Sequence, residues 1–394
     1  VYKRQLSTLY DYAFQGVSGG VLNLGSIQTS YANADVKWET TEQYNWGVDF
    51  AFWNNRLTFT SDIYLSKKKN MLFPLKIPPI AGTGTSGSVV LNVGDMQNKG
   101  IEFALGWRDK VGEVNYRVSA TYARNVNEIT RMAGTNKRSP LGSVSTGNST
   151  DDITFLCEGM EAGAFLMMPT NGIANTDAKL AEYQKLRPDA KLGDLVYVDR
   201  NKDGLLNDDD RIFCGSGAPE AEIGFNAGLD WKGFDFSMNW YASIGNEIVN
   251  GSKVASYQHN VNRDMLYQWS LDNPTSTIPS YRTTSHFNAR TYADIWVEDG
   301  SFLRLKNIVL GYALPKHIVR KCGLTKLRFY LAADNLLTLT KYDGYDPEVG
   351  NDGLSTRGLD MGTYPIAVQM RGGKSSEDNV FDLPSANTIR MQLK

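Results

Sequence analysis

One acidic segment has the residue types and the spacing of a calcium-binding loop. The twelve residues 199–210 read DRNKDGLLNDDD. Calcium loops of this kind take side-chain oxygens from positions 1, 3, 5 and 12, a backbone oxygen from position 7, and a glycine at position 6. We therefore predict that calcium is the cofactor of this chain, held by Asp199, Asn201, Asp203, the Leu205 carbonyl and Asp210.

The alternative for this segment is a solvated acidic turn closed by asparagine and glycine, without an ion. Position 12 is Asp210 where such loops usually carry glutamate, and the shorter side chain weakens bidentate binding. No helical pattern flanks the segment, so a bound ion would brace a long loop and would not act as an EF-hand switch. Millimolar affinity is sufficient for that role outside a cell.

Other residues that could do chemistry lack the arrangement that catalysis needs. The adjacent carboxylates at 151–152 and 208–210 cannot approach a sugar bond from two sides, as a glycosidase pair must. The three cysteines are widely spaced and form no CxxC pair, and the three histidines show no metal-ligand spacing. We therefore predict that the protein is not an enzyme.

The elements that would position the acidic loop are indicated by alternation of apolar and polar residues. Trp46, Val48, Phe50 and Phe52 alternate with polar or small residues, and the same period of two recurs along the chain. This periodicity predicts antiparallel strands near 44–53, 56–68, 97–107, 114–128, 221–231, 233–245, 301–313, 325–338 and 386–394.

Two features favour a transmembrane barrel over a soluble sandwich. Each strand carries an apolar row of about 25 Å, the height of the apolar band of an outer-membrane barrel, with aromatic residues near its ends. The connections also alternate between tight turns and long segments, as periplasmic turns and extracellular loops do. The expected fold is all-β, an antiparallel transmembrane β-barrel fragment with long loops at 70–96, 130–219, 247–299 and 341–384.

Composition argues against nucleic acid as a partner and against membrane-spanning helices. Lys and Arg number 41 and Asp and Glu number 43, so no basic surface predicts nucleic-acid binding. Mean hydropathy is −0.36, and no run approaches the roughly 18 apolar residues of a spanning helix. The chain starts at Val1 without a signal peptide, which indicates a fragment or a processed product.

The strand near 302–314 departs from simple alternation. Phe302, Arg304, Lys306, Ile308 and Leu310 share one parity, so an unbroken strand would turn two cations toward lipid. We expect either a β-bulge near 306–307 or a position above the membrane for both cations.

Five segments resemble motifs of the SusC/RagA-type TonB-dependent transporters of Bacteroidetes outer membranes, in the order of that family. They are 33–39 (NADVKWE) followed by 47–50, 92–102 (NVGDMQNKGIE), 193–211 with DRNKDG at 199–204, 299–307 (DGSFLRLKN) followed by 311–315, and 334–348 ending in DPE. Position 34 is alanine where the family usually has proline.

The resemblance implies a 22-stranded barrel in the outer membrane, of which 1–394 would be the C-terminal part without its plug domain. It also implies import of oligosaccharides or peptides, energy from TonB acting through the missing N-terminal part, and a SusD-like surface lipoprotein. Membrane lipid would surround the wall, and 130–219 would be an extracellular region carrying the calcium motif. The alternatives are a soluble secreted, calcium-clipped carbohydrate-binding module, and a passive barrel or adhesin.

Aromatic residues of the last long connection are candidates for substrate contact. Tyr342, Tyr345 and Asp346 could bind sugar by stacking and hydrogen bonding, whereas Gly344 and Pro347 favour a structural turn. No sequence motif identifies the substrate.

Overall fold

The protein is dominated by one large β-sheet. The computed structural model describes residues 9–18, 21–31, 35–76, 88–132, 138–147, 149–349, 353–376 and 388–390. The strands of the large sheet are β1 (Leu9–Ser18), β2 (Val21–Tyr31), β3 (Thr40–Phe52), β4 (Leu57–Lys76), β5 (Ser88–Val111), β6 (Val114–Met132), β13 (Ala221–Trp231), β14 (Phe234–Ile244), β17 (Phe302–Ala313), β18 (Leu327–Thr340), β20 (Gln369–Ser376) and β21 (Thr388–Arg390).

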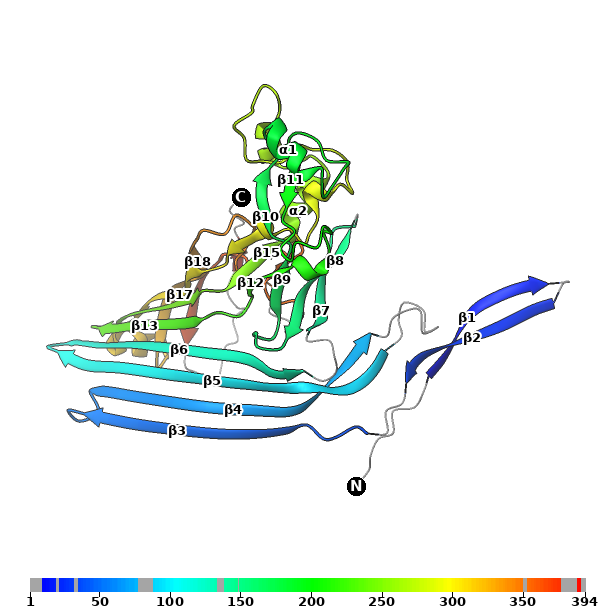
Figure 1. The fold of residues 1–394 in the computed structure, drawn as a ribbon. Coiled ribbons are helices and arrows are strands. Elements are labelled where there is room, and N and C mark those ends of the chain that lie inside the picture. The colour runs from blue at the N-terminus through cyan, green and yellow to red at the C-terminus, as the bar shows by residue number, and fades with distance from the viewer. Residues whose placement is uncertain are drawn as a thin grey trace.

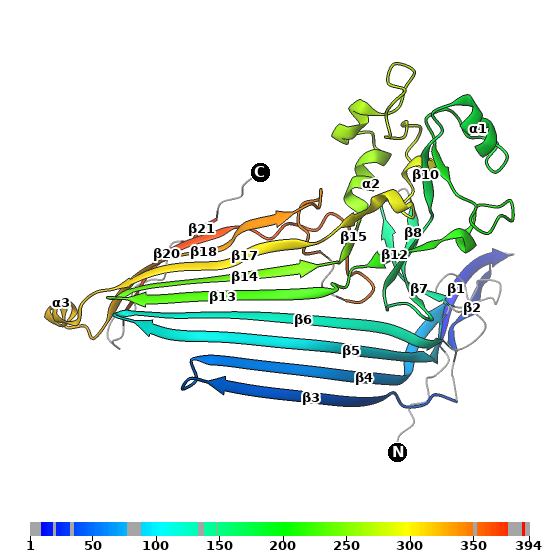
Figure 2. The same ribbon diagram turned by 60° about the vertical axis from the view of Figure 1, so that its left-hand side comes forward.

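These twelve strands form an open sheet. Their order is β1-β2-β5-β6-β13-β14-β17-β18-β20-β21, and β4 joins β5 to β3. All ladders are antiparallel except a two-residue contact between β2 and β5. Figures 1 and 2 show the sheet curved, with β3 along one edge and β20 and β21 along the other. Over the described residues no ladder joins these two edges.

One face of the sheet carries the apolar rows that the alternation predicts. Val48, Phe50, Leu105 and Leu331 are 48–66% exposed. Aromatic rings also stack across four adjacent strands, with centroid separations of 6.4, 6.1 and 6.2 Å along Phe50, Phe59, Phe103 and Tyr122. A continuous apolar surface of this size is unfavourable in water and suits contact with lipid.

Tryptophans lie at both ends of this apolar band. At the end of the sheet where β3 turns into β4, Trp53 meets Trp107 edge-on with ring centroids 5.9 Å apart. At the same end Trp231 stacks on Phe234 with centroids 6.3 Å apart. Trp46, which is 80% exposed, precedes Trp53 by roughly 23 Å at about 3.3 Å per residue. This separation matches the apolar band of an outer-membrane barrel, whose edges are marked by aromatic girdles.

The connections differ at the two ends of the sheet. Tight turns join β3 to β4, β5 to β6 and β13 to β14; the last is Lys232-Gly233, where both residues have positive φ (45° and 91°), as a two-residue hairpin requires. At this end the β17–β18 connection is longer and contains α3 (Lys316–Val319) and η6 (Arg320–Cys322). The connections at the opposite end are much longer, and they form most of the remaining structure.

The expected β-bulge is present at Lys306. The pairing of β17 with β14 and with β18 shifts on either side of this residue. Lys306 bonds Glu348 and the next residue, Asn307, bonds Asp334, so both polar side chains face the inner side of the sheet. The extra residue reverses the parity, and Leu310 then lies on the outer face, 50% exposed.

The long connections fold together into a second unit, which we call the cap: the described residues of 138–216, 246–299 and 341–362. Its elements are β7 (Arg138–Ser145), β8 (Thr150–Cys157), β9 (Ala164–Met167), β10 (Thr170–Ile173), α1 (Asp177–Tyr183), β11 (Leu195–Tyr197), η2 (Asp208–Asp210), β12 (Ile212–Ser216), β15 (Glu247–Asn250), α2 (Gly251–Gln258), η3 (Arg263–Tyr267), η4 (Phe287–Ala289), η5 (Asp294–Trp296), β16 (Val297–Asp299) and β19 (Leu359–Asp360). Figure 1 shows the cap rising from one end of the sheet.

The cap has its own hydrophobic core. Phe165 and Met167 of β9, Val254 of α2 and Trp296 of η5 are at most 2% exposed and belong to one buried cluster. Segments on either side of β13 and β14 in the chain therefore share a core. Among the described residues, no helix is long and apolar enough to span a membrane.

Several predicted strands and loops need correction. Residues 341–384 were expected to be one loop, but β20 lies within it; its glycines and charges (QMRGGKSS) hide the alternation. The hairpin of β1 and β2 was not predicted, and β4 and β5 are 20 and 24 residues long, well beyond their predicted ends. Of the expected last strand, 386–394, the structure describes only β21, and the remainder lies outside the described residues.

Candidate functional site

The acidic loop lies in the cap between β11 and β12. Asp199 accepts hydrogen bonds from the backbone N–H groups of Lys202 (2.6 Å) and Gly204 (2.9 Å). Asn201 and Asp203 each accept one from the residue two positions later, at 2.9 and 2.8 Å. Gly204 has φ +83°, so only glycine adopts this conformation without strain, and the chain folds back there.

The end of the loop returns to its beginning through Asp210. One carboxylate oxygen of Asp210 accepts from the N–H groups of Arg200 and Asn201 at 2.8 and 3.3 Å, and the other accepts from Asn207 at 3.1 Å. Asp210 is fully buried. The Leu205 side chain, by contrast, is 63% exposed. Four of the five predicted ligands thus belong to one closed hydrogen-bonded ring.

The other two acidic residues of the loop point outward. Asp208 pairs with Arg211 at 2.8 Å and Asp209 with Arg138 at 3.0 Å, and both carboxylates are about 70% exposed. Within the described ranges no group of three or more His, Cys, Asp or Glu side chains is gathered closely enough to hold a metal ion. Calcium at this loop therefore stays a prediction, which depends on Asn201 and the Leu205 carbonyl as well as on carboxylates.

The inner face of the sheet is lined by charged residues, most of them paired between strands. Arg117 of β6 pairs with Asp230 of β13 at 3.0 Å, and Asp49 accepts a hydrogen bond from Thr60 at 2.6 Å. Asp62 and Glu102 lie directly opposite each other on β4 and β5. Neither has an ion-pair partner among the residues that the structure describes.

A buried charge cluster connects the sheet to the cap. Arg304 of β17 donates to Asp346 at 2.6 Å, to Glu348 at 2.7 Å and to Thr338 at 2.9 Å. Lys306 binds the same Glu348 at 2.6 Å. The bulge therefore allows Arg304 and Lys306 to face the inner side of the sheet, where they bind the turn at 346–348 of the cap.

The contacts of the aromatic turn at 342–346 show which of its residues are structural and which is exposed. Tyr342 is 6% exposed and donates to Asp360 at 2.6 Å; burial, together with this hydrogen bond, raises the pKa of its phenol well above the usual value. Asp346 is equally buried against Arg304. Both residues are structural, whereas Tyr345 between them is 72% exposed.

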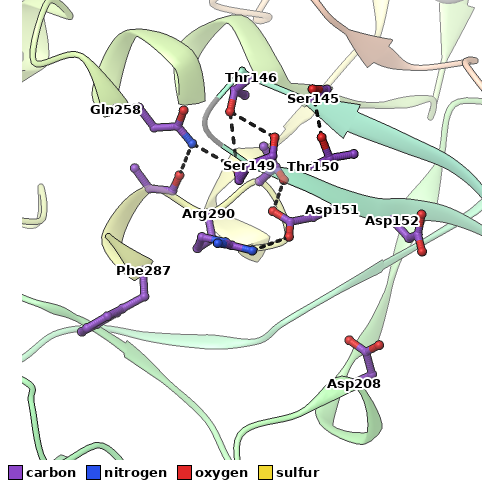
Figure 3. Close-up of polar contacts among 12 residues, drawn as sticks. Ser145, Thr146, Ser149, Thr150, Asp151, Asp152, Asp208, Gln258, Phe287 and Arg290 are labelled. Atoms are coloured by element: carbon purple, nitrogen blue, oxygen red, sulfur yellow. Dashed lines mark hydrogen bonds and ion pairs between the residues drawn. The ribbon is translucent and has the colours of Figure 1, made fainter. Parts of the chain in front are cut away.

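A polar cluster joins three parts of the cap (Figure 3). Asp151 of β8 is 7% exposed, pairs with Arg290 at 2.7 Å and accepts the Thr291 hydroxyl. Gln258 at the end of α2 is 1% exposed and donates to Ser149 and to the carbonyl of Ala289, at 3.3 and 2.8 Å. These contacts fix α2 against β8 and η4.

No pattern in the sequence indicated the open groove that lies between α2, η3 and the turn at 343–345. It encloses about 710 Å³, within the range of small-molecule sites, and Tyr267 and Tyr345 both line it. Its other lining residues are polar or charged apart from Val261 and Gly344. No sequence motif marks the groove, because its lining residues come from two connections, at 250–267 and at 343–345.

Comparison with known proteins places this architecture in a family. A family model described as "TonB dependent receptor-like, beta-barrel" matches residues 2–155. TonB-dependent receptor P3 of Formosa agariphila is 31% identical over 355 residues, 86% of this chain and 34% of that protein. TonB-dependent receptor SusC of Bacteroides thetaiotaomicron is 27% identical over 348 residues, 87% of this chain and 32% of that protein.

Solved structures agree on the fold. The structure of the RagAB peptide transporter superimposes with a TM-score of 0.72 at 24% identity, over 94% of this chain and 38% of that one. The present chain spans about a third of the length of the curated relatives that it matches. It belongs to the SusC/RagA-type TonB-dependent receptors of the outer membrane and comprises part of their β-barrel.

Proposed function

We propose that the complete receptor imports oligosaccharides or peptides across the outer membrane, with energy from TonB. The observation that carries this proposal is the asymmetry of the described residues: an apolar-faced wall with aromatic girdles bears a cap with its own core at one end, and the tight turns lie at the other. A passive pore needs no cap with its own core, whereas a receptor that selects large nutrients does. The cap end is then the extracellular end.

The partners follow from the same arrangement. A SusD-like lipoprotein would cover the cap, where Leu266 and Leu271 are 80% and 82% exposed. Such large apolar side chains on a surface loop suit a protein partner. TonB would act through parts of the receptor beyond this chain, and membrane lipid would contact the apolar face.

We assign no catalytic role to the acidic residues. Asp208 and Asp209 pair with arginines at the surface, and Asp151 is buried against Arg290, so neither adjacent set presents two opposed carboxylates to a sugar bond. The family assignment also argues against a soluble carbohydrate-binding module. Calcium in the 199–210 loop is retained as a proposal, supported by the ring of hydrogen bonds that already closes the loop.

Uptake by the native bacterium tests the import proposal. Deletion of the receptor gene should abolish growth on its nutrient at low concentration, and deletion of TonB should have the same effect. An affinity tag on the receptor should recover a surface lipoprotein encoded beside it. Uptake that persists without TonB would contradict active import and would favour a passive barrel.

A further inference from the structure

The groove between α2, η3 and the turn at 343–345 has the construction of a ligand site. Tyr267 and Tyr345 line it and are 58% and 72% exposed. Single exposed apolar residues are common on protein surfaces and need no explanation. Two aromatic rings that line one polar groove but come from separate connections are a stronger indication of a ligand site than a single exposed residue.

Both rings stand on rigid backbone. Tyr345 lies between Tyr342, which is held by Asp360 at 2.6 Å, and Asp346, which is held by Arg304 at the same distance. The backbone carbonyl of Tyr267 accepts hydrogen bonds from Asn273 at 3.0 Å and from Ser276 at 2.6 Å. Little backbone entropy would be lost on binding, so the segments that carry the two rings are preorganised to contact a ligand.

The floor of the groove is equally fixed. Tyr257 of α2 donates to Asp264 at 2.9 Å, which ties α2 to η3. Lys253 of α2 binds Asp343 at 2.9 Å and Glu298 at 3.4 Å, which ties α2 to the 343–345 turn. The polar cluster of Figure 3 holds the far end of the same helix through Gln258.

The charges of the groove select against ionic ligands. Its described lining contains two cations, Lys253 and Arg263, and two anions, Asp264 and Asp343. Lys253 and Asp343 already pair with each other, so no net charge of either sign is left to attract an ion. The remaining lining groups are mainly amides and hydroxyls, such as Asn250, Ser252 and Asn262, which bind neutral polar ligands.

The walls also disfavour an extended peptide. Peptides in extended form commonly bind by adding a strand to an exposed sheet edge. Here the groove is lined by α2, η3 and a turn, and its one strand residue in the described lining, Asn250, ends β15, whose two edges are already paired with β16 and β19. We propose that this groove is a binding subsite for a neutral oligosaccharide, whose sugar faces stack on Tyr267 and Tyr345 and whose hydroxyls bond the polar floor. This inference rests on the proposed import function and narrows its substrate class.

Binding to the complete receptor in detergent tests the subsite directly. The probes are neutral hexasaccharides of glucose, xylose and mannose, each measured by calorimetry, and a mixture of tryptic peptides. Tyr267→Ala and Tyr345→Ala should each weaken binding of the best hexasaccharide about tenfold. Tyr345→Phe keeps the ring and should stay within about twofold of wild type. Tyr364→Ala is the matched control, because Tyr364 is 71% exposed and does not line the groove.

The outcomes separate this inference from the import proposal. Wild-type affinity in both alanine variants, or binding of peptides but of no hexasaccharide at about 1 mM, overturns the oligosaccharide subsite and leaves TonB-dependent import standing. Hexasaccharide binding that depends on both tyrosines, without TonB-dependent uptake of any nutrient, would support the subsite and contradict import.

Discussion

Arg304 and Asp346 form an ion pair of 2.6 Å between side chains that are only 3% and 7% exposed. Arg304 belongs to a barrel strand and Asp346 to the cap, so this pair is one of the contacts that hold the two units together, beside the Lys306–Glu348 pair and the hydrogen bond from Ala162 to Asn127. A buried pair adds little stability compared with apolar packing, but removal of one partner leaves an uncompensated charge behind.

Replacement of Arg304 should therefore loosen the cap. We expect Arg304→Met to destabilise the 341–362 segment by about 3–5 kcal/mol, because Asp346 loses its arginine partner and Glu348 keeps only Lys306. Hydrogen exchange of that segment measures the effect. The double variant Arg304→Met/Asp346→Asn should recover part of the loss, and strictly additive effects would show that the pair is not coupled.

A charge introduced on the outer face of the sheet should destabilise the barrel more than removal of a charge from the inner face. Phe50 is at the middle of the apolar band, 49% exposed, and Phe50→Arg should cost about 2–4 kcal/mol in lipid. The adjacent inward variant Asp49→Asn should change stability by less than about 1 kcal/mol, since the amide oxygen of asparagine can still accept the hydrogen bond from Thr60. Urea titration of the complete receptor in vesicles compares the two; equal effects would contradict the assignment of faces.

Calcium binding should depend on the inner residues of the acidic loop and not on the outer ones. Calorimetry should detect binding at about millimolar calcium or tighter. Asp199→Ala and Asp203→Ala should abolish it and speed proteolysis of the loop. Asp209→Ala should leave binding unchanged, because that side chain is 71% exposed and pairs with Arg138. A wild-type loop that takes up no calcium at this concentration is only a turn.

The two described cysteines should react slowly with alkylating agents. Burial raises the pKa of Cys157 and Cys214 to about 11, so at pH 8 only about one thiol in a thousand is ionised. The rate of iodoacetamide labelling should rise about tenfold per pH unit up to pH 10, provided that the cap stays folded. Mass spectrometry of the two peptides follows each site, with urea-unfolded protein as the fast control. Labelling in the folded protein at the unfolded rate would show that the cap opens.

Sequence alone determined the barrel wall from β3 to β18, but not β1, β2 or β20. Alternation is a local property, because successive side chains of a strand point to opposite faces, so rows such as Trp46–Phe52 could be recognised without any partner. The bulge at Lys306 was also predictable, since two cations at outward parity conflict with a lipid surface. The acidic loop was visible because all its candidate ligands lie within twelve residues.

Only the tertiary structure decided the cap. Its core joins residues from both sides of β13 and β14, and its short strands carry no sustained period. Strand β20 was missed because glycines and charges replace apolar residues on an edge of the described sheet. The aromatic turn shows the same limit: in sequence Tyr342, Tyr345 and Asp346 looked equivalent, but burial against Asp360 and Arg304 made two of them structural and left Tyr345 exposed. Which side chains face a ligand depends on contacts between distant segments, and no local pattern encodes those contacts.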